Sequence, residues 1–345
     1  MVWHFGHVYN RNNQLLFNIK LKLAGLFKIM RKRGWIMGSR YTYKEFKHLL
    51  AEEVKKNFNN EADIKMHTVI KNNSLELESM VIVEKSMNVS PNFYLKFYYE
   101  DYLNGADIAD IAKGMAEKYN KMQNNEFGSF SMDISSCMDK IVCRLVSCER
   151  NSKLLEEIPY IPFLDMAIIF YYLVIENENG IGSVRISNSI MENWGMTVKT
   201  LYAVAIHNTE RLFPKVFCPL KLMLKSILDS EGQDIPEVFE CIENRCYDEG
   251  EAPFVLTNRK GVNGSAAILY PDCLKDIGKM TETGMYIIPS SIHELLIIPD
   301  DGQISPDGLK KMVEEVNISC VAADEVLSDM VYYYSVEKNI IEICN

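Results

Sequence analysis

The sequence lacks most of the motifs that reveal a function directly. No apolar run approaches the roughly 18–20 residues that a membrane-spanning helix needs, and the longest one, Phe163 to Ile175, is interrupted by Asp165. No Gly-x-Gly-x-x-Gly stands after a strand-like segment, no Gly-Lys-Ser/Thr phosphate loop is present, and no serine lies between glycines as in a nucleophile elbow. The sequence therefore predicts no cofactor.

Cysteines are present but are not spaced as metal ligands. The nine cysteines include no Cys-x-x-Cys pair, whereas structural zinc sites usually combine close cysteine pairs with histidine. We therefore predict no metal site. The odd number of cysteines, the length of 345 residues and the lack of a secretory signal favour free thiols in a reducing compartment, so we expect a cytoplasmic protein.

Acidic residues are missing from one end of the chain. Residues 1–36 hold seven basic residues and no Asp or Glu, so the formal net charge of −10 hides an asymmetry. Residues 37–345 contain 30 basic and 47 acidic residues, a net charge of −17. Because such a field repels a phosphate backbone, we expect no nucleic-acid partner.

The basic segment 1–36 allows three interpretations. Met37 precedes a well-formed amphipathic helix, and Arg31 to Gly34 is what a purine-rich ribosome-binding site would encode if translated. The first interpretation is therefore an over-extended start; the alternatives are a disordered or loosely helical arm and an amphipathic helix on an anionic membrane. A membrane surface is a partner only if residues 1–36 belong to the native protein.

Hydrophobic periodicity predicts an α+β fold with largely antiparallel sheets, built from strand pairs with intervening helices. Apolar residues at helical spacing predict a helix over 43–58, and two alternating stretches joined by Lys71 to Ser74 predict a hairpin over 64–83. Thr197 is a plausible N-cap for a helix that ends before Pro214. The polar stretch 120–135 separates a predicted domain at 37–125 from a larger one at 135–345, with an alternative split of the latter near 230–252.

Other segments carry more specific predictions. Val89 to Phe97 is expected to be extended at a sheet edge, 215–229 to be helical throughout, and Ala266 to Tyr270 to be a strand. Ser305-Pro306 should cap and start a helix that turns Leu309, Met312, Val313 and Val316 inward. The final residues should form a terminal hairpin.

The most suggestive cluster for catalysis lies between two apolar strands. It comprises Ser290, Ser291, His293 and Glu294. A nucleophilic serine needs a histidine within hydrogen-bonding reach and a carboxylate to orient that histidine. On a strand, Ser291 and His293 would point to the same side and Glu294 away. The alternative is a polar turn whose hydroxyls satisfy main-chain groups.

A basic loop supplies a second candidate. Asn258, Arg259 and Asn263 belong to a glycine-containing connection that could hold an anion through main-chain N–H groups. A plain hairpin connection is the alternative. Asp324, Glu325 and Asp329 could gather a divalent cation, although such acidic runs are usually solvated helix ends.

An ordered set of motifs resembles one bacterial family. The motifs are Asn88 to Pro91, Lys140 to Val146, Ile186 to Ser189 with Trp194-Gly195, Tyr286 to Glu294, and Glu325 to Asp329. From about Tyr43 to the C-terminus the chain is similar to the domain of unknown function 5688, found mainly in anaerobic gut Firmicutes. The resemblance implies a bacterial cytosolic protein and carries over no activity and no functional residues.

Taken together, these patterns favour a non-enzymatic interaction or regulatory protein of the bacterial cytoplasm, with a protein partner. The alternative is a hydrolase-like enzyme with an atypical site around Ser291 and His293.

Overall fold

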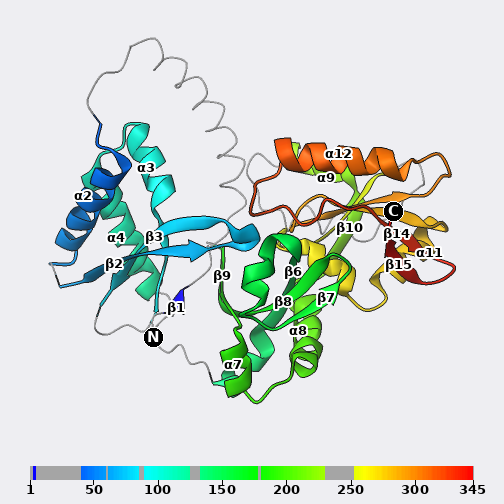
Figure 1. Cartoon of the computed structure of the whole chain (residues 1–345), viewed down its shortest axis with the longest axis horizontal. Coiled ribbons are helices and arrows are strands. Elements are labelled where there is room, and N and C mark those ends of the chain that lie inside the picture. Colours follow the sequence, from blue (N-terminus) through cyan, green and yellow to red (C-terminus); the bar gives the residue numbers. More distant parts are fainter. Residues whose placement is uncertain are drawn as a thin grey trace, which may run out of the picture. The chain divides into compact units, whose positions relative to one another are not determined.

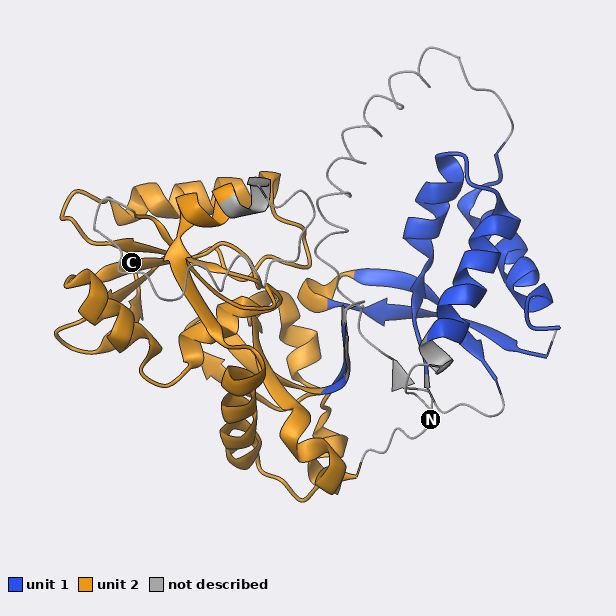
Figure 2. Cartoon of the chain, turned by 180° about the vertical axis from the view of Figure 1, so that it is seen from behind, with its two compact units in different colours: residues 1–71, 76–132, 173–184 blue, residues 72–75, 133–172, 185–345 orange. Residues whose placement is uncertain are grey.

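The computed structural model describes residues 3–4, 40–59, 61–84, 89–124, 133–177, 180–229 and 252–344. The chain forms two compact units, coloured separately in Figure 2. Unit 1 comprises residues 1–71, 76–132 and 173–184, and unit 2 comprises residues 72–75, 133–172 and 185–345. Each unit is described by itself.

Unit 1 combines three helices with a small antiparallel sheet (Figure 1). The helices are α2 (Tyr43–Lys56), α3 (Leu95–Leu103) and α4 (Ile108–Asn124). The sheet has the order β2 (Asp63–Ile70), β3 (Glu76–Val83) and β5 (Phe93–Tyr94), and a separate short pair joins β1 (Trp3–His4) to β4 (Val89–Ser90). A capping box starts α2: the Glu45 N–H donates to the Thr42 hydroxyl, and the Thr42 N–H donates to the Glu45 carboxylate.

The core of unit 1 forms where α2 and α4 meet one face of this sheet. The apolar stripe of α2 buries Phe46, Leu50 and Val54, which pack with Met80 and Ile82 of β3. Aromatic rings from α3 close the edge of this core, with the Phe46 ring centroid 5.2 Å from that of Tyr99. The helical spacing of apolar residues in α2 is therefore what anchors it to the sheet.

The first part of unit 2 is a strand group covered by a helix. It contains α5 (Ile134–Cys137), η3 (Met138–Lys140), β6 (Ile141–Ser147), η4 (Glu149–Asn151), α6 (Ser152–Leu155), β7 (Tyr160–Phe163) and β8 (Met166–Asn177). The strands run in the order β6-β8-β7, and β9 (Gly180–Arg185) also pairs with β8. The end of β8 from Leu173 onward and β9 up to Val184 group with unit 1. After α7 (Asn188–Asn193), helix α8 (Val198–Leu212) starts at Thr197, whose hydroxyl accepts the Thr200 N–H.

The second part of unit 2 is a six-stranded antiparallel sheet in the order β10-β11-β13-β12-β14-β15. The strands are β10 (Lys215–Pro219), β11 (Phe254–Asn258), β12 (Met285–Pro289), β13 (Leu295–Pro299), β14 (Tyr332–Ser335) and β15 (Ile340–Ile343). Helices α9 (Leu220–Asp229) and α12 (Pro306–Ser319) cover the same face (Figure 1), because the hydrophobic clusters beneath both include Leu296. Segments η6 (Gly264–Leu269) and α11 (Cys273–Thr281) complete this part.

The opposite face of the six-stranded sheet is the most deeply buried part of unit 2. Leu256, Ile287, Ile297 and Tyr332 are fully buried there. The Tyr332 hydroxyl donates to Asp165 Oδ1 at 2.6 Å, and the Ser328 hydroxyl donates to the other oxygen of the same carboxylate at 2.6 Å. These two bonds satisfy a carboxylate that would otherwise be costly to bury.

The turn between β2 and β3, η1 (Asn72–Ser74), groups with unit 2. Asn73 has a left-handed φ of 56°, a conformation that asparagine tolerates better than most residues. Its N–H donates to Asn151 Oδ1 at 2.8 Å, and Asn151 Nδ2 donates back to Asn73 Oδ1 at 3.0 Å. The predicted turn is therefore present, and its Asn73 is held by two hydrogen bonds to Asn151.

The predicted fold class is confirmed: the described sheets are antiparallel except for the β1–β4 pair, and helices alternate with strand pairs. The helix from Tyr43, the 64–83 hairpin, the Thr197 cap and the terminal hairpin are all present. One of the points at which the chain passes from unit 1 to unit 2 lies between residues 132 and 133. The predictions for a split near 230–252 and for residues 1–36 other than Trp3–His4 lie outside the described residues.

Three local predictions are wrong. Only Val89–Ser90 and Phe93–Tyr94 are extended, because Leu95, Tyr98 and Tyr102 have helical spacing and start α3. Residues 215–219 form β10, whose alternation buries Val216 and Cys218. Residues 264–269 form a 3₁₀ turn because Gly264 packs directly against neighbouring main chain.

A fourth difference concerns α12. Val313 is buried and Leu309 packs against the hydrophobic cluster between the helix and the sheet, but Met312 and Val316 are 45% and 40% exposed. The apolar stripe is wider than the contact with the sheet, so one flank of it faces outward. Among the described residues, we find no helix with the length and apolar character to span a membrane.

Replacing Leu50 by Ala should lower the free energy of unfolding of unit 1 by about 2–5 kcal/mol, because the side chain is fully buried and leaves a cavity. Hydrogen exchange of α2 peptides, read by mass spectrometry, should speed up accordingly. Met66→Ala, at an exposed position of the same unit, serves as the control and should leave this exchange unchanged. Equal effects of the two variants would contradict the assigned core.

Candidate functional site

The candidate Ser–His–Glu cluster forms the connection between β12 and β13. Pro289 pairs with Leu295, so residues 290–294 make a tight turn rather than continuing either strand. Ser291 and His293 are each only 6% exposed. The turn is therefore a buried polar structure inside unit 2.

The two serine hydroxyls are directed at Glu294. Ser291 Oγ donates to Glu294 Oε1 at 2.9 Å, and Ser290 Oγ lies 3.4 Å from the same oxygen. The Ser291 hydroxyl also accepts the N–H of His293 at 2.9 Å. The expectation that Glu294 points away is wrong, because a turn instead of a strand brings this carboxylate back over Ser291.

The His293 ring is held on both of its nitrogens. Nδ1 accepts the main-chain N–H of Asn263 at 3.0 Å, so this nitrogen carries a lone pair and the ring proton of the neutral imidazole sits on Nε2. Nε2 lies 3.5 Å from Glu325 Oε1. A serine base needs an imidazole nitrogen that faces the hydroxyl, and here the two ring nitrogens face Asn263 and Glu325 instead.

Main-chain groups of the turn are satisfied from two other loops. The Thr257 hydroxyl donates to the His293 carbonyl at 2.8 Å, and Ser265 donates its hydroxyl to the Ile292 carbonyl at 2.7 Å. From the opposite direction the Ile292 N–H donates to the Glu325 carbonyl at 2.9 Å. The three segments 257–265, 289–294 and 323–326 thus form one polar knot, which we call the His293 knot.

The His293 knot leaves no room for a side chain at one position. A Cβ on Gly264 would lie 2.2 Å from Thr257 Oγ1 and 2.4 Å from the His293 carbonyl oxygen. Both distances are far below van der Waals contact. Gly264 is therefore required by close approach, and its role is structural.

The predicted anion-binding loop uses its own polar groups internally. Asn258 is buried, its Nδ2 donates to the Val262 carbonyl at 2.9 Å, and its Oδ1 accepts the Lys260 N–H at 3.0 Å. The N–H of Asn263 is bound to His293, and the N–H of Arg259 donates to the Pro214 carbonyl at 2.9 Å. These main-chain donors of the loop are engaged by the protein itself, so they do not form an anion cradle.

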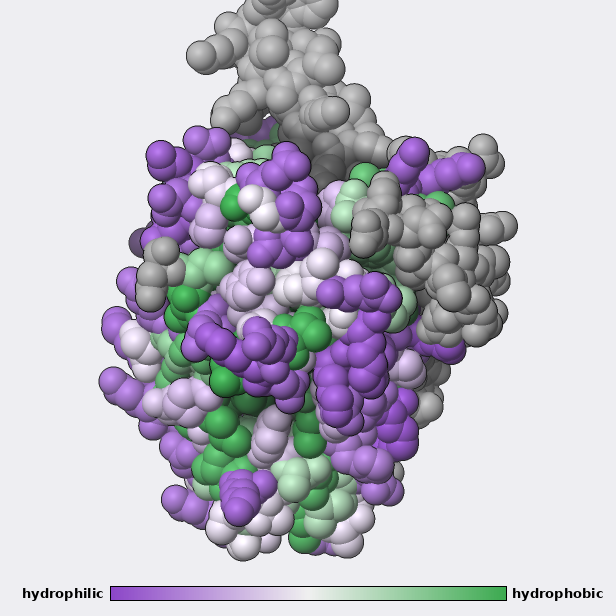
Figure 3. Space-filling view, turned by 90° about the vertical axis from the view of Figure 1, so that its right-hand side faces the viewer, coloured by the Kyte–Doolittle hydropathy of each residue, from purple (hydrophilic) through white to green (hydrophobic). Residues whose placement is uncertain are grey.

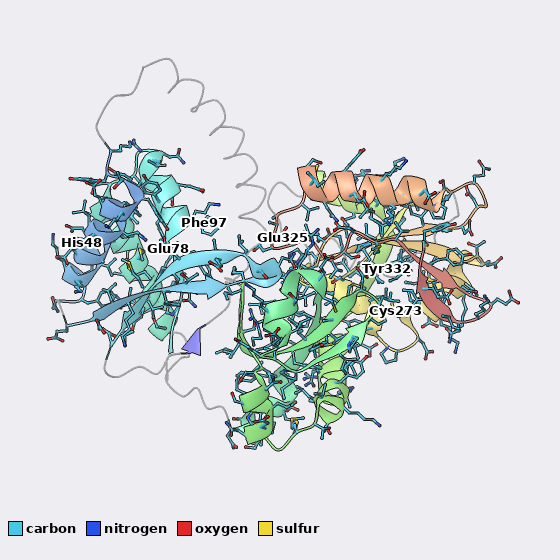
Figure 4. The ribbon with its side chains drawn as sticks, in the orientation of Figure 1. His48, Glu78, Phe97, Cys273, Glu325 and Tyr332 are labelled. Carbon is cyan, nitrogen blue, oxygen red and sulfur yellow. The ribbon has the colours of Figure 1, made fainter. Side chains whose placement is uncertain are left out.

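The acidic residues near the C-terminus are likewise spread over separate roles. Glu325, which is labelled in Figure 4, has its Oε1 3.5 Å from His293 Nε2. Asp329 instead pairs with Arg150 at 2.6 Å. Within the ranges that the structure describes, no group of three or more His, Cys, Asp or Glu side chains is placed to hold a metal ion.

A charged cluster in the first strand group of unit 2 was not anticipated from the sequence. The guanidinium carbon of Arg144 lies 3.9 Å from the centroid of the Tyr171 ring. Burial raises the pKa of Tyr171, but the charges of Arg185 and Arg144 outweigh it and hold the pKa below its usual value. The signal in the sequence was a lone arginine inside the apolar run Ile141–Val146. The arrangement is a cation–π stack that polarises a phenol.

Comparison with known proteins gives a family and no activity. Residues 43–336 match a family model described as a family of unknown function (DUF5688), so the chain belongs to this family. The resemblance inferred from the motifs is confirmed, with the match ending at Val336. No curated protein and no solved structure matches the chain.

Replacing Gly264 by Ala should lower the free energy of unfolding by about 3 kcal/mol or more, because the new methyl group collides with main chain that cannot move aside. Gly114→Ala in α4 is the matched control, since its Cβ meets nothing within 4 Å. The control should instead stabilise by about 1 kcal/mol, through helix propensity. Chemical denaturation of both variants measures the difference, and a Gly264→Ala protein as stable as the parent would refute the His293 knot.

Proposed function

We propose that this chain is a non-enzymatic interaction protein of the bacterial cytoplasm, which acts by binding another protein. The observation that carries the proposal is the outward face of α12, formed by Gly308, Lys311, Met312, Glu315 and Ile318. Ile318 is 88% exposed and Met312 is 45% exposed. Large apolar side chains in such positions are typical of protein-binding surfaces.

Charge supports a protein partner over a nucleic acid. The net charge of −17 on residues 37–345 disfavours a phosphate backbone. On the side of the molecule drawn in Figure 3, hydrophobic residues are interspersed with hydrophilic ones. Such mixed surfaces are what transient protein interfaces present.

The cysteines support the cytoplasmic assignment. Six described cysteines are free: Cys143, Cys148, Cys218, Cys273, Cys320 and Cys344. Burial raises the pKa of Cys143 to about 11 and that of Cys218 to about 12, so both thiols remain protonated near neutral pH. Free and unreactive thiols suit a reducing compartment.

The hydrolase-like alternative has one observation in its favour, the carboxylate of Glu325 beside the His293 ring. A carboxylate–imidazole pair is one half of a serine-hydrolase triad. The other half is not assembled, because the Ser291 hydroxyl donates to Glu294 and the second imidazole nitrogen accepts a main-chain N–H. The geometry therefore favours binding over hydrolysis.

Affinity purification from the native host tests the proposed function. The parent chain should capture a protein that Ile318→Asp fails to capture, because a charge placed in an apolar contact must be desolvated on binding. Met280→Asp, at an apolar position of α11 that is 53% exposed, is the control and should capture the same protein as the parent. Identical captures by all three forms, or no capture by the parent, would argue against the outward face of α12.

A serine-directed fluorophosphonate probe tests the alternative. We expect no labelling of the folded chain, because Ser291 is buried and its hydroxyl donates to Glu294 rather than to an imidazole nitrogen. Mass spectrometry of the probe-treated protein, compared with Ser291→Ala, provides the measurement. Stoichiometric modification of Ser291 that disappears in His293→Gln would replace the binding proposal with a hydrolase.

A further inference from the structure

The outward face of α12 carries a pattern that is complementary to itself. Successive residues of an α-helix advance by about 100° around the axis, which places Gly308, Lys311, Met312, Glu315 and Ile318 on one broad side. The buried residues Val313 and Asn317 lie on the opposite side. Lys311 and Glu315 therefore stand in the middle of the outward face, with a glycine near its beginning and an isoleucine near its end.

Within the part of the chain that the structure describes, the charges and the shape of this face are both unmatched. Among the described residues, neither Lys311 nor Glu315 takes part in an ion pair, although they are four apart on the same helix. Gly308 leaves a gap on the surface, since a Cβ there would meet only Ser305 atoms at 3.6 Å and beyond. Ile318 is the corresponding projection, with 88% of its surface exposed.

We propose that α12 pairs with α12 of a second copy of this chain, the two helices running antiparallel about a two-fold axis that crosses the outward face at the level of residue 313 along the helix. This inference rests on the proposed function and names its partner. A two-fold axis at residue 313 places position 311 opposite the partner's position 315, and position 308 opposite the partner's position 318. Closed two-fold dimers are the commonest protein assemblies, and such an interface uses the same patch twice.

Pairing in this register satisfies every unmatched feature of the face. Lys311 meets the partner's Glu315, and the symmetry repeats this ion pair on the other side of the axis. Ile318 fills the gap over the partner's Gly308, while Met312 lies beside its own symmetry mate near the centre. Opposite charges arranged in this way set register and orientation more than they set affinity.

The contact is small, because only one face of a 14-residue helix is used on each side. Interfaces below the standard size are weak and transient. The dimer should therefore be concentration-dependent, and added salt should weaken it because salt screens the Lys311–Glu315 ion pairs of so narrow a contact.

Sedimentation velocity on the full chain, over roughly a hundredfold range of concentration, tests the pairing. The parent should form dimers that dissociate on dilution. Lys311→Glu and Glu315→Lys should each raise the dissociation constant at least tenfold, because each places like charges opposite one another. The double variant Lys311→Glu/Glu315→Lys should restore the dimer, and so should a mixture of the two single variants, since both arrangements are complementary again.

Two outcomes would overturn the pairing: a parent that stays monomeric at every concentration, or single and double charge variants that associate equally. Circular dichroism of each variant verifies that α12 is still folded. The proposed function fails by a different result, since it requires capture of some protein that Ile318→Asp loses. A monomeric parent that still captures such a protein would remove the dimer alone.

Cross-linking fixes the register independently. In a Cys320→Ser background, a cysteine at position 312 would lie about 3 Å along the axis from its mate, whereas a cysteine at position 318 would lie about 15 Å away. A short bis-maleimide should therefore join Met312→Cys protomers and not Ile318→Cys protomers. The reverse preference, or equal yields at both positions, would contradict an antiparallel pair centred on residue 313.

Discussion

The burial of a polar turn is the constraint on which the structure of unit 2 depends. A histidine ring, two hydroxyls and several main-chain groups lie inside the protein at residues 290–294, where each must find a partner or cost free energy. The partners come from segments far apart in the sequence: Asn263 and Thr257 on one side and Glu325 on the other. Because β11 leads into the first of these segments, and β12 and β13 flank the turn, satisfying it fixes three adjacent strands of the six-stranded sheet in register.

The same constraint explains why this turn looked like a catalytic site. Serine, histidine and glutamate are the residues that activate a nucleophile, and they are also residues that satisfy buried main-chain groups. Composition cannot separate these uses; the direction of each hydrogen bond can. Ser291 donates to a carboxylate, and His293 accepts from a main-chain amide at one nitrogen, so neither bond is the serine–histidine bond of a hydrolase triad.

Local signals in the sequence predicted much of the fold. The Thr197 cap, the stripe of α2 and the 64–83 hairpin follow from interactions within a few residues. Errors arose where a distant contact decided the outcome. Residues 266–270 have strand-like composition, yet Gly264 must touch the His293 carbonyl, and a 3₁₀ turn is what brings it there. The role of Arg144 could not be predicted, because its stacking partner, Tyr171, is 27 residues away in the sequence and meets it only across the β6–β8 pair. The family could be inferred from the order of several motifs along the chain. A physical argument about a single segment does not identify a family.

A buried polar residue also decides which side of α12 faces solvent. Asn317 is buried, and its Nδ2 donates to the Ser328 carbonyl at 2.9 Å and to Asp329 Oδ1 at 2.8 Å. Apolar packing alone is not directional and would let the helix rotate to cover Met312 and Val316, which would bury more apolar surface. Rotation would break both bonds of Asn317 and leave its amide unsatisfied inside the protein, which costs about 1–3 kcal/mol. The exposed flank of α12 is therefore held outward by the hydrogen bonds on its buried side, and its apolar side chains remain available to a partner because the fold itself cannot reach them.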